Sequence, residues 1–281
     1  MNKLLIFAKS PIKGKVKTRL KKDTPLTDED ILRLYTAFLK DTIVSASLSK
    51  AQKIYIAYYP EDSREVMIDI IKGVKGSRGR GIKGFFTRTL KSIELFPQSG
   101  NDFDARLTNA LKYIHNKSSD NIIILGSDSP HIQPTIINRA FSFLSNLQFG
   151  GGMVLGPSGE GGVYLIGLKS AIRNPQSAIS FKGVFTSGNE SDNLLQIAKS
   201  KKLPLLILEE LIDVDVKSDL ITLISNLSMM QYPSRNTKIH LPKYTINTIK
   251  ELGLAVDRKG GGTRGKYLSR KKFLDLSLLR E

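Results

Sequence analysis

A basic loop following an apolar run holds the first residues whose types and spacing could do chemistry. The run is Leu4-Leu5-Ile6-Phe7-Ala8, and residues 9–22 after it carry seven cations and no acid. Such a concentration of like charge needs screening, so the loop indicates either a phosphate site or a solvated basic surface. Loops that follow buried strands hold phosphates in α/β proteins. A nucleotide is therefore the expected anion.

The same loop superficially resembles a P-loop, because Gly14 is followed by Lys17 and Thr18. In a P-loop, a glycine directly precedes the lysine, so that backbone amides can wrap the phosphates. Here Val16 occupies that position and the upstream glycine is missing. The sequence thus argues against a P-loop while leaving phosphate binding open.

A carboxylate follows the next strongly apolar run, 121–125, within Gly126-Ser127-Asp128-Ser129-Pro130. Open α/β sheets bind ligands at the carboxyl ends of their strands, where an acid can hold Mg²⁺ against phosphate oxygens. Asp128 is therefore a candidate metal ligand, and the neighbouring serines are candidate supporting groups. The alternative is that Asp128 only caps a turn or helix.

A glycine-rich turn, 156–162, lies between two apolar runs and contains Glu160, Gly161 and Gly162. Glycines permit positive φ angles and close approach of the backbone to a ligand, although a tight hairpin would need them too. Glu160 is the one charged residue of this turn, which makes it a candidate base or substrate contact.

A pair of aspartates, Asp213 and Asp215, forms the last constellation. In an extended segment, alternate residues share a face, so both carboxylates could bind one cation. The alternative is a strand end that caps the following helix.

The elements that must position these groups alternate between strand and helix patterns. Strands are expected at 53–59, 121–125, 152–155, 163–168 and 204–208, and helices at 31–43, 62–71, 104–115, 134–147, 189–199 and 218–227. This alternation predicts a three-layer α/β/α domain with a mostly parallel central sheet. We expect an inserted loop at 72–91 and a basic C-terminal extension at 229–281, a small helical subdomain with helices at 246–252 and 268–279.

The composition restricts the chemistry further. The chain has 281 residues, a formal net charge of +17, no cysteine and three histidines. These counts exclude thiolate chemistry and argue against zinc, so a metal would be Mg²⁺ or Mn²⁺ on carboxylates. No apolar run is long enough to span a bilayer or to form a signal peptide, which predicts a cytoplasmic protein without a transmembrane segment.

The ordered motifs resemble a poorly characterised bacterial and archaeal family of GT-A-like glycosyltransferases, related to molybdenum-cofactor and phospholactate guanylyltransferases. The resemblance covers about residues 3–222 and rests on the motifs at 7–20, 96–107, 125–130, 156–168 and 213–215. It implies a nucleotide-diphospho-sugar transferase fold over residues 1–228. The residues expected to bind nucleotide or phosphate are Lys9, Lys17, Arg19, Gly126, Ser127, Gly161 and Gly162. Asp128 and Asp215 are expected to bind the metal, and Asp128 and Glu160 to act in catalysis.

Two departures from the family pattern concern the glycine turn. The family usually has Asp before the paired glycines and an aromatic residue after them, whereas this chain has Glu160 and places its aromatic one position later, at Tyr164. Because Glu is longer than Asp by about one C–C bond, the catalytic role of Glu160 is in question. An inactive relative that retains nucleotide affinity is the corresponding alternative.

The resulting hypothesis is a metal-dependent transferase that uses a nucleoside triphosphate or a nucleotide sugar. Glycosyl transfer to a small-molecule or lipid-linked acceptor is favoured, and nucleotidyl transfer with release of pyrophosphate is the alternative. A hypothesis from another class is nucleic-acid binding through 72–91 and the basic tail, although the tail lacks a known reader motif and is poor in aromatic residues.

Overall fold

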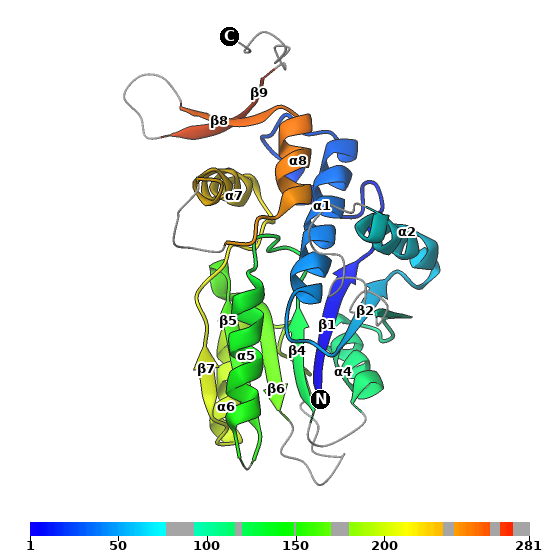
Figure 1. The fold of residues 1–281 in the computed structure, drawn as a ribbon, viewed down its shortest axis with the longest axis vertical. Helices are drawn as coiled ribbons and strands as arrows, with labels where there is room; N and C mark the ends of the chain where they lie inside the picture. Colours follow the sequence, from blue (N-terminus) through cyan, green and yellow to red (C-terminus); the bar gives the residue numbers. More distant parts are fainter. Residues whose placement is uncertain are drawn as a thin grey trace.

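A seven-stranded, mostly parallel sheet forms the centre of the computed structural model, which describes residues 1–76, 93–115, 120–148, 150–169, 180–232, 239–258 and 265–271 (Figure 1). The strands are β1 (Asn2–Lys9), β2 (Lys53–Tyr59), β3 (Ile93–Pro97), β4 (Asn121–Leu125), β5 (Gly152–Pro157), β6 (Val163–Lys169) and β7 (Leu205–Ile207). Their order is β3-β2-β1-β4-β6-β5-β7. Only β6 runs antiparallel to its neighbours within the described sheet. The expected fold class is confirmed.

The two most apolar strands lie side by side in the middle of the sheet. Leu5 of β1 pairs with Ile124 of β4 on one side and with Tyr55 of β2 on the other. Every residue of β4 is buried, as expected for a strand covered on both faces. The loops that follow β1 and β4 therefore leave the sheet next to each other at its carboxyl edge.

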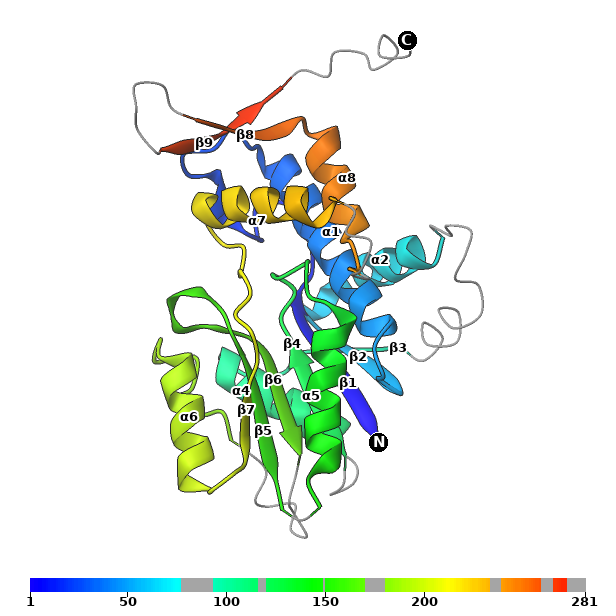
Figure 2. The same cartoon turned by 60° about the vertical axis from the view of Figure 1, so that its left-hand side comes forward.

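Helices cover both faces of the sheet, as Figures 1 and 2 show. One face packs against α1 (Asp28–Ser47), α2 (Arg64–Gly76) and α5 (Pro134–Asn146), and the other against α4 (Phe103–Ile114) and α6 (Glu190–Ser200). The start of α1 is fixed by a capping box in which Thr27 and Asp30 bond each other's backbone amides, at 2.8 and 3.2 Å. No helix among the described residues has the length and apolar character needed to cross a membrane.

A third apolar cluster lies beyond the carboxyl edge of the sheet. There α7 (Lys217–Met230), α8 (Lys243–Glu251) and the hairpin of β8 (Leu254–Arg258) and β9 (Lys266–Arg270) pack against α1 and the short 3₁₀ helix η1 (Thr18–Lys21). Figure 2 shows this layer above the sheet. The proposed domain boundary at residue 228 falls within the last turn of α7 and stays a prediction.

Three local expectations differ from the structure. Leu268 was expected in a helix but lies on β9, because pairing with Val256 of β8 outweighs its local helical spacing. The start of the expected inserted loop, 72–76, continues α2, and residues 77–91 of that loop lie outside the described residues. β3 was not predicted. The segment 272–281 also lies outside the described part of the chain.

Candidate functional site

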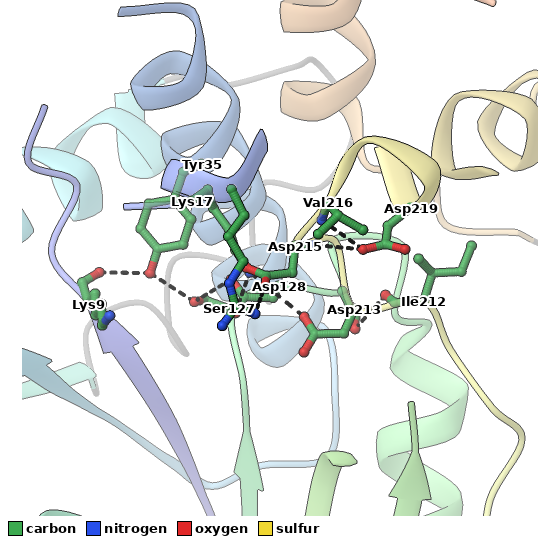
Figure 3. A network of polar contacts seen from close by, with 12 residues as sticks. Lys9, Lys17, Tyr35, Ser127, Asp128, Ile212, Asp213, Asp215, Val216 and Asp219 are labelled. Atoms are coloured by element: carbon green, nitrogen blue, oxygen red, sulfur yellow. Dashed lines mark hydrogen bonds and ion pairs between the residues drawn. The ribbon is translucent and has the colours of Figure 1, made fainter. Parts of the chain in front are cut away.

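Lys17 is the centre of a group of carboxylates at the carboxyl edge of the sheet (Figure 3). It precedes η1 in the left-handed region, with φ 46° and ψ 38°. Its Nζ lies 2.9 Å from Oδ2 of Asp128, 3.5 Å from Oδ1 of Asp215 and 3.9 Å from Oδ1 of Asp213. These four residues, here called the acid–lysine cluster, bring three of the predicted motifs together.

The two acidic loops of the cluster are joined through their backbones. The Val214 amide donates to the Asp128 carbonyl at 3.0 Å, and the Ser129 hydroxyl donates to the Ile212 carbonyl at 2.8 Å. The separation between Asp128 and Asp215 is therefore set by main-chain contacts as well as by Lys17. The alternation of residues along the extended segment also places the carboxylates of Asp213 and Asp215 on one side, since both approach the ammonium group of Lys17.

Tyr35 of α1 joins the basic loop to the loop after β4. Its buried hydroxyl donates to the Lys9 carbonyl at 2.8 Å and lies 3.0 Å from Oγ of Ser127, which in turn lies 3.4 Å from Oδ1 of Asp128. Burial raises the pKa of Tyr35, so the hydroxyl stays protonated. Tyr35 lies within the helix expected at 31–43, and the sequence analysis missed this contact.

Asp219 fixes the position of Asp215. One of its carboxylate oxygens accepts the amides of Asp215 and Val216, at 2.9 and 2.8 Å, at the start of α7. An acid at this end of a helix also interacts favourably with the helix dipole. The alternative interpretation of the 213–215 segment as a helix-capping region is thus partly correct, although Asp219 supplies the cap and leaves Asp215 free to face Lys17.

The electrostatics of the cluster are unbalanced. The Lys17 side chain is only 8% exposed, and although burial opposes its charge, the carboxylates of Asp128 and Asp213 raise its pKa above the usual value. Burial, followed by the charge of Asp128, raises the pKa of Asp213 to about 6. Oδ1 of Asp213 is buried without a hydrogen-bond partner. Three carboxylates around one lysine leave excess negative charge at this edge.

The remaining cations of the basic loop contact the cluster differently. Arg19 donates from Nη1 to Oδ2 of Asp215 at 2.7 Å, and its side chain is 75% exposed. Lys9 enters the network through its carbonyl, while the residue itself is exposed. The ion pair of Arg19 with Asp215 is therefore largely in contact with water and is screened by it.

The glycine turn is part of an antiparallel hairpin, the simpler of the two interpretations offered for its glycines. β5 and β6 pair on either side of the short 3₁₀ turn η3 (Gly159–Gly161), and Glu160 in that turn is exposed with φ 58°. No hydrogen bond or ion pair within the described residues joins Glu160 to the acid–lysine cluster. Gly156 is required by packing, since a Cβ there would lie 2.5 Å from Cζ of Tyr164.

The paired glycines of this turn contact α6. The Ser191 hydroxyl donates to the carbonyl of Gly161 at 2.5 Å and lies 3.3 Å from that of Gly162. Gly126 directly follows β4 and contacts β6 on the edge opposite to β5. Its amide donates to the Tyr164 carbonyl at 3.1 Å. The roles of Gly126, Gly161 and Gly162 in nucleotide binding stay predictions.

The donor set of the cluster suits a hard divalent cation. Carboxylate oxygens are the ligands that Mg²⁺ and Mn²⁺ prefer, and Oδ1 of Asp213 is buried without a hydrogen bond, 3.9 Å from the Lys17 ammonium group. In the described ranges, however, no three His, Asp or Glu side chains converge on a metal-sized position, since the ammonium of Lys17 lies between the carboxylates. Asp128 and Asp215 therefore fit the predicted metal in chemical type.

Comparison with known families and structures concerns the family and the fold of this chain. Residues 51–188, just under half of the chain, match the family described as "Uncharacterized protein conserved in bacteria (DUF2064)". Over these residues the chain has the sequence pattern of that family, which confirms the expected resemblance to a poorly characterised bacterial family. None of the curated proteins matches the chain at a significant level.

Solved structures show the fold. A protein of Desulfovibrio desulfuricans G20 described as a nucleotide-diphospho-sugar transferase is 21% identical, with a TM-score of 0.61, and the match covers 89% of this chain and 97% of that chain. A cytidylyltransferase from Leptospira borgpetersenii serovar Hardjo-bovis is 16% identical, with a TM-score of 0.49, covering 89% and 94% of the two chains. The first likeness assigns the nucleotide-diphospho-sugar transferase fold to this chain.

Proposed function

We propose that this protein, which shares the pattern of the DUF2064 family over residues 51–188, is a metal-dependent transferase that uses an activated nucleotide. Transfer of a sugar from a nucleotide sugar is the favoured reaction, and nucleotidyl transfer from a nucleoside triphosphate is the alternative. The observation that supports this proposal best is the acid–lysine cluster, which combines hard carboxylate ligands with phosphate-binding cations at the carboxyl edge of a parallel sheet.

Three residues of the cluster and several residues outside it have proposed roles. Lys17 and Arg19 bind the phosphates, because charge-assisted hydrogen bonds from ammonium and guanidinium groups are the strongest that side chains offer an anion. Asp128 and Asp215 hold Mg²⁺ or Mn²⁺. Lys9, Gly126, Ser127, Gly161 and Gly162 are the proposed further contacts of the nucleotide, and Glu160 is the proposed second catalytic carboxylate.

The chemistry common to both reactions is the departure of a polyanionic phosphate. A divalent cation, when bound, neutralises part of that charge. Lys17 contributes a preorganised positive charge, since its position is fixed by burial and by a left-handed backbone rather than found during the reaction. Tyr35 holds the loop after β4 through Ser127, and Asp219 holds the 213–215 segment through the amide of Asp215.

The Lys17 ammonium group keeps its position in this proposal but changes its partner. In the structure it compensates the carboxylates, and binding of a metal would transfer that compensation to the cation and leave the ammonium group available to phosphate. Arg19 follows the same logic at Asp215. The cluster thus contains both the ligands for the cation and the donors for the anion of a metal–nucleotide complex.

The reaction type is tested by incubating the protein with a panel of nucleoside triphosphates and nucleotide sugars in Mg²⁺ or Mn²⁺. Release of a nucleoside diphosphate identifies glycosyl transfer, and release of pyrophosphate identifies nucleotidyl transfer. Calorimetry should show nucleotide binding that requires the metal. The proposal is wrong if no donor binds or turns over under these conditions.

The role of Asp128 is tested with Asp128→Asn, which keeps the shape of the side chain and removes its charge. We expect metal-dependent nucleotide binding to be abolished and the thermal unfolding midpoint to stay close to that of the unmodified protein. Asp69→Asn is the matched control, because Asp69 lies on the outer surface of α2 with a side chain that is 73% exposed. Unchanged Mn²⁺-dependent binding in Asp128→Asn would remove Asp128 from the metal site.

A further inference from the structure

An apolar slot opens at the same edge of the sheet, on the face that packs against α4 and α6. Its volume is about 70 Å³. Phe7 of β1, Phe103 and Leu107 of α4, Val163 of β6 and Phe185 are five of its ten lining residues, and all ten are uncharged. This slot differs in kind from the acid–lysine cluster, because it offers no ionic partner to a ligand.

The aromatic wall of the slot is partly open to water. The ring of Phe103 packs against those of Phe7 and Phe185, with centroid distances of 5.2 and 4.8 Å, yet Phe103 remains 38% exposed. Contact with water is unfavourable for such an apolar surface. A ligand that covers the ring therefore gains free energy from its apolar atoms.

A buried carboxylate holds this wall in place. Asp104 is 3% exposed and accepts hydrogen bonds from the amides of Gly183 and Phe185, at 2.8 and 2.9 Å, and from the hydroxyl of Thr186 at 2.7 Å. With three donors, the carboxylate is fully engaged, and it is a positioning residue for the loop that carries Phe185. The slot is thus preformed, so a ligand need not order its walls on binding.

The slot adjoins the proposed reaction centre along the chain. Gly126 lines it and lies two residues before Asp128, while Phe7 lies two residues before Lys9 on β1. The Gly126 amide is bonded to the Tyr164 carbonyl at 3.1 Å, which fixes the boundary between slot and cluster. A molecule that reaches the reacting phosphate at Asp128 can therefore extend into the slot without leaving the sheet edge.

We propose that the slot receives an apolar group of the acceptor, either a branched alkyl group of four or five carbons or one edge of an aromatic ring. This inference rests on the proposed transferase function. The phosphates of the donor need cations, which the slot lacks, and a nucleobase or sugar carries polar atoms that would lose hydrogen bonds there. Its volume is about half of the roughly 150 Å³ that holds benzene in an engineered protein cavity, so it takes one small apolar group.

Saturation-transfer NMR on the full chain tests the slot directly, with 3-methyl-1-butanol and benzyl alcohol as probes and glycerol as the polar control. We expect both probes to bind and glycerol not to bind. Phe103→Asp places a carboxylate at the mouth of the slot and should weaken probe binding at least tenfold. The matched control Phe103→Leu should retain binding. Asp is well tolerated in the first turn of a helix, where Phe103 lies.

A second variant and a nucleotide titration complete the test. Val163→Phe should fill the slot and abolish probe binding, which keeps the test informative if Phe103→Asp fails to fold. Probe binding that is equal in the unmodified protein and in both slot variants would overturn the proposal, as would displacement of the probe by nucleotide alone, which would assign the slot to the donor. Calorimetry of nucleotide binding separates the two proposals. Nucleotide binding without probe binding contradicts only the proposal for the slot, whereas the absence of nucleotide binding contradicts the transferase function.

Discussion

Two buried lysines at opposite ends of β1 have contrasting surroundings. Lys3, with a side chain that is 4% exposed, lies 2.6 Å from Asp120 and donates to the Ile114 carbonyl at 2.7 Å. Lys17 lies beyond the other end of the strand and faces three carboxylates that are each about a third or more exposed. One lysine has a matched partner, and the other has an excess of partners.

The pKa values of Asp120 and Asp213 differ because the two lysines compensate their neighbouring carboxylates to different extents. Burial alone would raise the pKa of Asp120, but the Lys3 ammonium and the Met1 amino group hold it below the usual value. Burial and the charge of Asp128 raise the pKa of Asp213 to about 6, and Lys17 compensates only part of that effect. Removal of one partner from a balanced buried pair destabilises the fold, whereas the carboxylates around Lys17 are only partly compensated.

The largest effect in this comparison is expected for Lys3→Met. This change leaves the buried carboxylate of Asp120 without its main partner and should lower the free energy of unfolding by about 3 to 5 kcal/mol. Urea denaturation at pH 7 measures it, with the exposed Lys50→Met as control. A loss below about 1 kcal/mol would mean that water compensates Asp120 and that the two lysines are not different in kind.

Lys17→Met should affect ligand binding more than folding. Loss of one charge-assisted hydrogen bond to phosphate should weaken nucleotide binding by about 1.5 to 3 kcal/mol, which is about 10- to 150-fold in the dissociation constant. Calorimetry measures it, and Lys15→Met in the same loop is the control because Lys15 is exposed. An unaltered dissociation constant would restore the interpretation of this loop as a solvated basic surface.

The dependence of stability on pH should differ in sign between the two carboxylates. Asp213 has a folded-state pKa of about 6, above the usual value of an aspartate, so its contribution to stability is present below about pH 4 and is lost as the pH rises through 6. Asp120 behaves oppositely, since its lowered pKa stabilises the fold above pH 4 and that contribution is lost at lower pH.

Asp213→Asn isolates the first of these contributions. The variant should gain stability relative to the unmodified protein above pH 6, by about 1 kcal/mol once solvent screening of a 42% exposed side chain is allowed for. Denaturation curves between pH 4 and 8 measure the difference in free energy of unfolding between the variant and the unmodified protein. The control Asp69→Asn should show the same dependence of stability on pH as the unmodified protein. A stability difference between Asp213→Asn and the unmodified protein that decreases with rising pH would contradict the raised pKa of Asp213.

The smallest effect is expected for the folding stability of Arg19→Ala. The pair of Arg19 with Asp215 involves a side chain that is 75% exposed, and exposed ion pairs contribute about 0 to 1 kcal/mol. Chemical denaturation should therefore barely change, while nucleotide affinity should fall. A folding loss well above 1 kcal/mol would place Arg19 with Lys3, among the structural cations.

The central strands could be predicted because their apolar runs are continuous, as 121–125 shows. β3 could not, since its residues 93–97 are only partly buried at the edge of the sheet and their pattern is short. The same limit applies to Leu268, whose strand partner Val256 is identified only by the folded hairpin. The local sequence pattern is sufficient to predict a strand that is buried on both faces of the sheet. It is insufficient where pairing with another strand determines the structure of the segment.

The candidate site was predictable where it follows strands. The segments that contain Lys17, Asp128 and Asp215 are predicted from their positions after apolar runs, and the family resemblance implies the roles of the three residues. The structure brings these residues to one point. Their direct ion pairing differs from the expectation, because the sequence analysis assigns the cations to phosphate and the carboxylates to a metal. The contacts of Tyr35 and Asp219 depend on where α1 and α7 cross the loops, which no local pattern encodes.

The central place of β1 also shapes how the chain is made. Leu5 pairs with Tyr55 on one side and with Ile124 on the other. At about 5 to 20 residues per second, a ribosome adds Ile124 about 6 to 24 s after Leu5. During that interval an apolar strand presents a bare edge to neighbouring nascent chains. Whatever shields this edge during translation governs how much of the chain reaches the folded state.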